Sequence, residues 1–371
     1  MNAHTRGAIE MFETLLDVTG WDISPKAASV ILALVIGLTF GVLAERTKFC
    51  FRSALIGENA RSSMGIWLTA LAFAIIGTQA AVFAELITFE GHRFNAAGLP
   101  IVAIISGGLM FGAGMVLTRG CASRLTVLAG TGNLRALFVM ILFAITAHAA
   151  LKGALSPIRT TLGAITVDMG DTTSFAALPG GALLWSAVIS LAALAFAARS
   201  HARLTQLLPA ALLGLLVPAA WVGTGFVLFD EFDPIALESL SFTSPMAESL
   251  FWSVASTSIP AGFGTGLIGG VLAGALLASL LFGSFVWQSF ESPAQTGRYM
   301  GGAVLMGLGG VLAGGCTVGA GLAGIPSLSF AALLALLAIT AGALGMNRLL
   351  TRSNDRVSGA PSTKQTILPA E

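Results

Sequence analysis

Nine long apolar stretches dominate the chain and constrain its fold more than any other feature. A helix needs about 20 consecutive apolar residues to cross the hydrocarbon core of a bilayer, and most of the stretches are close to that length. The eighth is shorter and leads directly into Gly314-Gly315-Cys316. The pattern predicts an all-α polytopic membrane protein with about nine transmembrane helices, some of them broken or re-entrant. The predicted spans are 27–44, 66–87, 101–118, 134–152, 182–198, 206–228, 262–282, 299–313 and 327–346.

The composition excludes an ordinary soluble domain. Hydrophobic residues make up 55% of the chain and charged residues 10%, whereas soluble domains are about 25% charged. We expect an N-terminal interfacial segment over 1–26, a single transmembrane domain over 27–346, and a polar, disordered tail over 347–371. Residues 1–26 carry several acidic side chains and lack the basic start and apolar core of a cleavable signal peptide.

The distribution of basic residues predicts the orientation in the membrane. With the N-terminus outside, 14 of the 19 Lys and Arg residues fall on inner loops and on the tail. The segment from Asp230 to Ala261 carries five acidic residues and no Lys or Arg, which indicates an external loop. The positive-inside rule therefore predicts an external N-terminus and a cytoplasmic C-terminus.

The chain has three cysteines, and each stands where an apolar stretch breaks: Cys50, Cys121 and Cys316. Their separations of 71 and 195 residues match no short metal-binding or redox motif. An odd number of cysteines also argues against a closed set of disulfides. Small buried thiols often do no more than fill space, but two of the three share the context Gly-Cys, which favours a common role.

An internal repeat is visible when the sequence is shifted by 195 residues. The shift places four glycines and Cys121 on four glycines and Cys316 within fifteen positions. In the nine-span topology the Cys121 break lies at the inner end of span three and the Cys316 break at the outer end of span eight. This is the pattern of an inverted repeat whose broken helices meet near the midplane. Gly37-x3-Gly41 also matches Gly270-x3-Gly274, although those two helices are predicted to run the same way.

The glycines beside two of the cysteines, Gly120 and Gly315, have two interpretations. Glycines spaced four apart allow close helix contact. Alternatively, a helix that stops at Gly-Cys and restarts leaves backbone N–H groups that an anion can satisfy. Three arginines near the cysteines leave a similar choice, between attracting an anion and anchoring the protein under the positive-inside rule. They are Arg52, Arg119 and Arg124.

Thiol chemistry narrows the class of solute. A cysteine is a weak hydrogen-bond donor and a weak acceptor, so it can hold a soft sulfur atom briefly and release it. No carboxylates or histidines stand near the cysteines in the sequence to complete a metal site. We predict no metal, no cofactor and no nucleic-acid partner, and the absence of a nucleotide-binding loop argues against direct ATP coupling.

Three segments that end in or surround the cysteines resemble the cysteine motifs of the YeeE/YedE family: Gly41–Arg52, Gly112–Cys121 and Gly307–Gly319. The resemblance covers about residues 27–346. It implies an hourglass-like bacterial inner-membrane transporter, and not an enzyme, in which thiosulfate passes along Cys50, Cys121 and Cys316 through S–H···S hydrogen bonds. Some family members work with a small TusA-like sulfur-carrier protein, and the chain itself contains no such domain.

Two other functions stay open at this point. One is transport of another soft solute, such as a selenium-containing anion or a metal. The other is a membrane thiol oxidoreductase, which ranks last because the chain has no C-x-x-C pair and no pattern of quinone or haem ligands.

Overall fold

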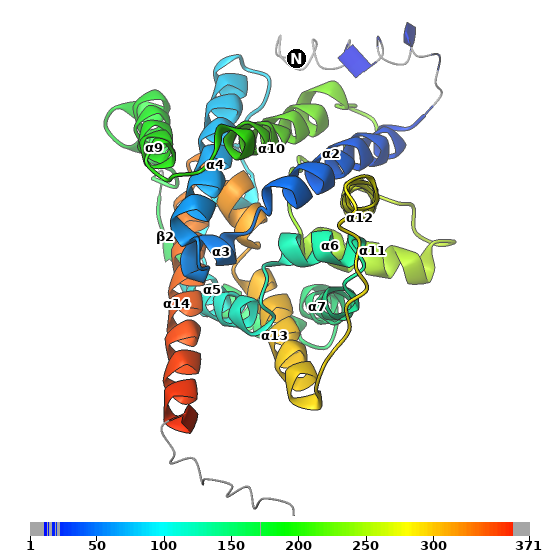
Figure 1. Cartoon of the computed structure of the whole chain (residues 1–371). Coiled ribbons are helices and arrows are strands. Elements are labelled where there is room, and N and C mark those ends of the chain that lie inside the picture. The colour runs from blue at the N-terminus through cyan, green and yellow to red at the C-terminus, as the bar shows by residue number, and fades with distance from the viewer. Residues whose placement is uncertain are drawn as a thin grey trace, which may run out of the picture.

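The structure, a computed structural model, describes residues 11, 12, 14, 17, 18, 20, 23–170 and 172–358. Its described part is mostly helical, with two short strands (Figure 1). The α-helices are α2 Pro25–Thr47, α3 Phe51–Ile56, α4 Ala60–Phe83, α5 Ile101–Leu117, α6 Ala122–Gly130, α7 Leu134–Lys152, α8 Ser156–Gly163, α9 Gly181–Ala198, α10 Leu204–Val222, α11 Thr243–Ala255, α12 Phe263–Leu281, α13 Pro293–Leu312 and α14 Phe330–Ser358.

Shorter elements complete the described chain. Three are 3-10 helices, two are π-helices and two are strands, which pair antiparallel. They are η1 Arg93–Asn95, η2 Phe175–Ala177, η3 Gly223–Val227, η4 Thr317–Gly324, η5 Ile325–Ser327, β1 Gly98–Leu99 and β2 Val167–Asp168.

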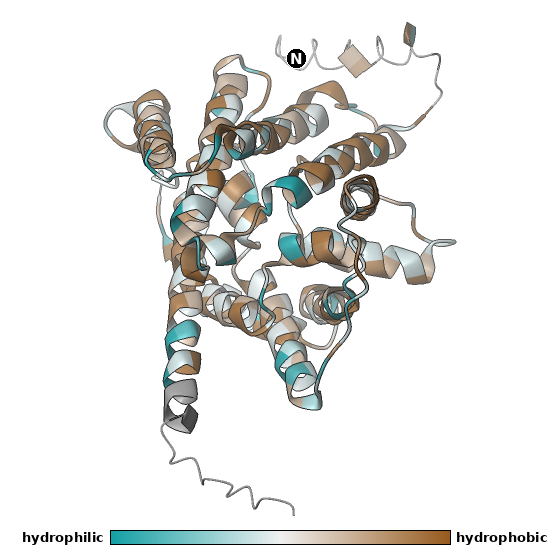
Figure 2. Cartoon of the chain, viewed as in Figure 1, coloured by the Kyte–Doolittle hydropathy of each residue, from teal (hydrophilic) through white to brown (hydrophobic). Residues whose placement is uncertain are grey.

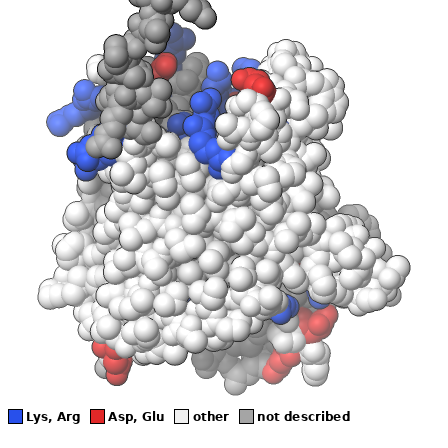
Figure 3. Space-filling view, turned by 90° about the horizontal axis from the view of Figure 1, so that it is seen from below, with Lys and Arg blue, Asp and Glu red and all other residues white. Residues whose placement is uncertain are grey.

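Nine helical segments within the described residues are long and apolar enough to cross a membrane, which confirms the predicted fold class. They run over Pro25–Ile56, Ala60–Phe83, Ile101–Gly130, Leu134–Lys152, Gly181–Ala198, Leu204–Val227, Phe263–Leu281, Pro293–Ser327 and Phe330–Arg352. Figure 2 shows hydrophobic residues along the long helices and hydrophilic ones at the end of α2, the start of α13 and the later part of α14. A belt without charged residues separates two charged ends in Figure 3, one with most of the visible Lys and Arg and the other mainly acidic.

The predicted domain limits at residues 26/27 and 346/347 do not coincide with the ends of helices. The boundary at residue 346 lies inside α14, whose backbone stays helical to Ser358. The predicted interfacial segment 1–26 lies largely outside the described residues, apart from the start of α2 at Pro25. The predicted external loop between Asp230 and Ala261 contains the 13-residue helix α11.

Helices α5 and α13 pack antiparallel through small residues. Gly107 faces Gly309, and Gly114 faces Gly302. Gly302 and Gly309 are the residues on which the 195-residue shift places Gly107 and Gly114. The contacts are therefore reciprocal, as they are across a two-fold axis, and the two repeats run in opposite directions at this helix pair.

The match between the Gly-x3-Gly pairs of α2 and α12 reflects direct packing and not the inverted repeat. Gly37 lies against Gly270, and Gly41 lies against Gly274, so α2 and α12 pack side by side in the same direction. These glycines let two backbones approach closely. They are packing partners of one another and not equivalent positions of an inverted repeat.

Candidate functional site

All three cysteines occupy the same local backbone structure. A long helix ends at a residue in the left-handed conformation, namely Lys48 (φ 52°), Arg119 (φ 58°) or Gly314 (φ 74°). The cysteine follows two residues later with extended backbone and caps the N-terminus of a short helix, α3, α6 or η4. The sequence indicates this structure for Cys121 and Cys316, where glycines precede the thiol. The sequence does not indicate this structure at Cys50, because Lys48 and Phe49 precede that thiol in place of glycines.

Cys50 and Cys121 lie side by side, although 71 residues separate them. Their Sγ atoms are 3.8 Å apart, within reach of an S–H···S hydrogen bond in which either thiol can donate. The Oγ of Ser123 lies 3.4 Å from the Cys121 Sγ. The exposed fractions of Cys50 and Cys121 are 5% and 1%, so water is largely excluded from this pair.

Cys316 is fully buried in the same hydrophobic core as the other two thiols. The backbone N–H of Gly319 donates a hydrogen bond to the Cys316 Sγ at 3.3 Å. Gly319 also lines a cavity of about 450 Å³, which we call the vestibule. Cys316 is therefore one hydrogen bond away from a residue of the vestibule wall.

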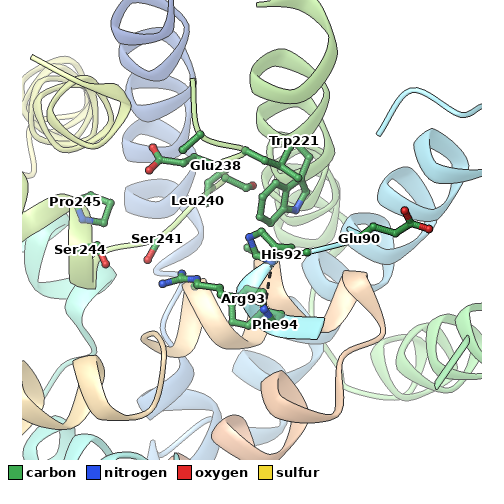
Figure 4. Close-up of a pocket in the computed structure, with 16 residues that line it drawn as sticks. Glu90, His92, Arg93, Phe94, Trp221, Glu238, Leu240, Ser241, Ser244 and Pro245 are labelled. Carbon is green, nitrogen blue, oxygen red and sulfur yellow. Dashed lines mark hydrogen bonds between the residues drawn. The ribbon is translucent and has the colours of Figure 1, made fainter. Parts of the chain in front are cut away.

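The vestibule is built by segments that are far apart in the sequence (Figure 4). Arg93 comes from η1, Ser241 from the segment before α11, and Ser244 from α11 itself. Figure 4 shows the Arg93 guanidinium on the same side of the cavity as the two hydroxyls. The Ser241 Oγ is buried and has no hydrogen-bond partner among the described residues. Arg93 also lies close enough to Cys316 for an electrostatic interaction.

Two titratable side chains face the vestibule beside Arg93. Burial, and then the negative charge of Glu248, raise the pKa of Glu238 to about 7 against the opposing effect of Arg93. Burial, followed by repulsion from Arg93, lowers the pKa of His92 to about 4. His92 also packs edge-on against Trp221, with ring centroids 5.3 Å apart. Near neutral pH the vestibule wall therefore includes one guanidinium, a neutral imidazole and the partly protonated carboxyl group of Glu238, together with the side chain of Glu90.

A second cavity, of about 350 Å³, lies at the opposite end of α5, and we call it the arginine cavity. Arg52, Arg119 and Arg298 line it together with Asn347 and Thr351 of α14. α5 begins near the vestibule and its 17 residues span about 25 Å. Arg52 is close enough to Cys50 and Cys121 for electrostatic interaction. The thiols thus lie near two cavities, and each cavity has at least one arginine in its wall.

The remaining predicted site residues have other neighbours. The Arg124 guanidinium forms an ion pair with Glu45 at 3.3 Å and is mostly buried, so its charge is balanced within the protein. Gly120 and Gly315 do not have positive φ, and the left-handed residues are their predecessors Arg119 and Gly314.

A side chain on either glycine would meet a neighbour. A Cβ on Gly120 would meet the Leu125 side chain at 3.1 Å, and a Cβ on Gly315 would meet the Ala320 backbone nitrogen at 2.9 Å. Close packing of the turn, more than unusual dihedral angles, explains both glycines.

Sequence reasoning missed three residues that line the cavities: Arg93, Ser241 and Arg298. Arg93 is one of five basic residues on the acidic side of the predicted topology. That position, against the positive-inside trend, is the sequence signal that marks it. Ser241 and Arg298 carry no such signal.

Comparison with known proteins assigns the family. A family described as sulphur transport matches residues 46–344. The thiosulfate transporter TsuA of Spirochaeta thermophila is 28% identical over 340 residues, covering 81% of this chain and 93% of its own length. The protein of the same name from Escherichia coli is 26% identical over 325 residues, covering 79% of this chain and 86% of its own length. The three cysteine segments, the nine spans and the match over most of the sequence agree, and the chain belongs to the YeeE/YedE family of sulphur-transport proteins.

Proposed function

We propose that this protein takes up thiosulfate across the bacterial inner membrane through a relay of its three thiols. The observation that carries the proposal is the position of the thiols, with Cys316 beside the vestibule and the Cys50–Cys121 pair beside the arginine cavity. Thiosulfate has charged oxygens, which suit arginine, and a soft terminal sulfur, which suits a thiol. Two relatives named thiosulfate transporters support this substrate.

In the proposed path the anion first enters the vestibule, where Arg93 and the Ser241 hydroxyl, unpaired among the described residues, contact its oxygens. Its terminal sulfur then accepts a hydrogen bond from Cys316. The next acceptor position is at the pair formed by Cys121 and Cys50, whose sulfur atoms are 3.8 Å apart. Each step exchanges one weak hydrogen bond for another, and the solute leaves chemically unchanged.

The proposal includes an orientation, a domain organisation and a partner. The vestibule faces outside and the arginine cavity faces the cytoplasm, in keeping with the positive-inside rule. Residues 27–346 form the transport domain, in contact with membrane lipid, between the N-terminal segment and the cytoplasmic tail. A TusA-like sulfur-carrier protein is a candidate receiver on the cytoplasmic side.

Growth on thiosulfate as the sole sulfur source tests the proposal in a bacterium without its own sulfate and thiosulfate importers. We expect the wild-type gene to restore growth, and Cys50→Ala, Cys121→Ala and Cys316→Ala each to abolish or strongly reduce uptake of labelled thiosulfate. Ser279→Ala is the matched control, because Ser279 is equally buried and, within the described part of the chain, its Oγ hydrogen-bonds only to its own helix. Full uptake by all three cysteine variants at equal expression would reduce the thiols to packing residues.

A further inference from the structure

The arginine cavity concentrates positive charge, and none of the described residues that line it is acidic. Three of the seven residues that line it are arginines. They come from three separate parts of the chain: Arg52 from α3, Arg119 from the turn after α5, and Arg298 from α13. Three like charges around one space repel one another, so an arrangement of this kind favours a bound anion.

The hydrogen-bonding state of these arginines points the same way. The ion pairs among the described residues are Arg124–Glu45 and Arg135–Glu291, so Arg52, Arg119 and Arg298 take part in none of them. The Nε atoms of Arg52 and Arg298 are buried without a hydrogen-bond partner within the described chain. A buried donor on a charged group is costly when unpaired, and an oxyanion in the cavity would satisfy both.

The cavity adjoins the thiol pair. Arg52 follows Cys50 by two residues and Arg119 precedes Cys121 by two residues. Both arginines therefore belong to the segments that bring the two sulfur atoms together. Asn347 and Thr351 of α14 add an amide and a hydroxyl to the wall. The guanidinium groups, the amide and the hydroxyl all suit oxygen atoms, whereas a thiol suits sulfur.

We infer that the arginine cavity is a second anion site, which binds the tetrahedral oxyanion group common to thiosulfate, sulfate and phosphate. It recognises the oxygens of the anion and not its terminal sulfur. Sulfate therefore occupies this site although the thiols do not conduct it, and it competes there with thiosulfate. The identity of thiosulfate as the transported anion rests on the proposed function, while the oxyanion chemistry of the cavity does not.

Calorimetric titration of sodium sulfate and sodium thiosulfate into the purified full-length protein tests the site. The titration is done in an Arg93→Gln background, so that the vestibule does not contribute. We expect Arg298→Gln to weaken sulfate binding about tenfold or more, the usual effect of losing a charged hydrogen bond, and Arg298→Lys to restore part of the affinity. Arg348→Gln is the matched control, because Arg348 is exposed on α14 beside Asn347 and does not line the cavity.

Additional variants and lipid conditions distinguish failure of the thiol relay from failure of the anion site. Cys316→Ala protein should bind sulfate with wild-type affinity, so loss of thiosulfate uptake together with intact sulfate binding tells the relay and the site apart. Equal sulfate affinity in Arg93→Gln protein with and without Arg298→Gln or Arg52→Gln would overturn the inference, provided that melting temperatures show folded proteins. The phosphate of a lipid headgroup is the other oxyanion group that could occupy the arginine cavity. Loss of sulfate binding in phosphatidylglycerol nanodiscs, but not in phosphatidylcholine nanodiscs, would assign the cavity to a headgroup and overturn the soluble-anion site.

Discussion

Arg93 supplies the guanidinium of the vestibule, and a substitution there tests the proposed binding of thiosulfate in this cavity. Removing a charged hydrogen bond costs about 1.5–3 kcal/mol, so we expect Arg93→Gln to raise the KM for thiosulfate uptake about tenfold or more. Arg159→Gln is the control, because Arg159 lines the adjoining cavity and already donates to the carbonyls of Ala150 and Leu151. An unchanged KM in Arg93→Gln vesicles would remove Arg93 from the path.

Glu238 predicts a pH dependence of uptake. Its pKa of about 7 means that it loses its negative charge as pH falls through neutrality. Anion affinity should therefore rise as pH falls, by about three- to tenfold between about pH 8 and pH 6. The charged groups around Glu238 are Arg93 and Glu248, with Lys26 and Asp233 in the neighbouring cavity.

Two substitutions assign this pH dependence. Glu238→Gln should give a pH-independent KM close to the wild-type value at low pH. His92→Phe should keep the pH dependence, because the low pKa of His92 leaves the imidazole neutral throughout the range. A wild-type KM that is flat with pH, or that rises as pH falls, would contradict the assignment to Glu238.

At the scale of secondary-structure elements, the turn that joins α13 to η4 holds Cys316 in place. A Cβ on Gly315 would lie 2.9 Å from the Ala320 nitrogen, whose N–H bonds the Cys316 carbonyl at 2.8 Å. We expect Gly315→Ala to displace this turn and reduce uptake severalfold, at a cost in stability of about 1–3 kcal/mol. Gly301→Ala, within α13, meets no atom within 4 Å and should behave as wild type. Melting temperature and uptake are measured on the same preparations, and normal uptake by Gly315→Ala would contradict the expectation.

The helices themselves were predictable, because a bilayer requires long apolar stretches and the chain has nine of them. The paired glycines of α5 and α13 also follow from the sequence, since two cysteines and their neighbouring glycines recur at one shift. The approach of Cys50 to Cys121 does not follow, because tertiary packing brings them together across 71 residues. The same holds for Ser241 and Arg298, whose local sequence is that of an ordinary loop and an ordinary helix start.

On the scale of the whole molecule, the two charged ends predict which residues face each side of the membrane. In a variant with the three cysteines replaced by alanine, we expect Asp233→Cys to react with a membrane-impermeant maleimide in intact cells. Thr351→Cys, at the arginine cavity, should react only after permeabilisation. The expected result follows from the separation of basic and acidic residues by an uncharged belt in Figure 3. The reverse labelling pattern would invert the proposed direction of transport.

The burial of the thiols has a consequence for the electrical insulation of the membrane. The vestibule and the arginine cavity share no lining residue, and the three thiols are at most 5% exposed. Hydrated ions cross only where water is continuous, because stripping a charge of water costs several kcal/mol. In the proposed path, a zone of sulfur and hydrocarbon interrupts that water and offers weak donors to a soft anion. A transporter that works in the proposed way would therefore not dissipate the ion gradients that power the cell's other transport.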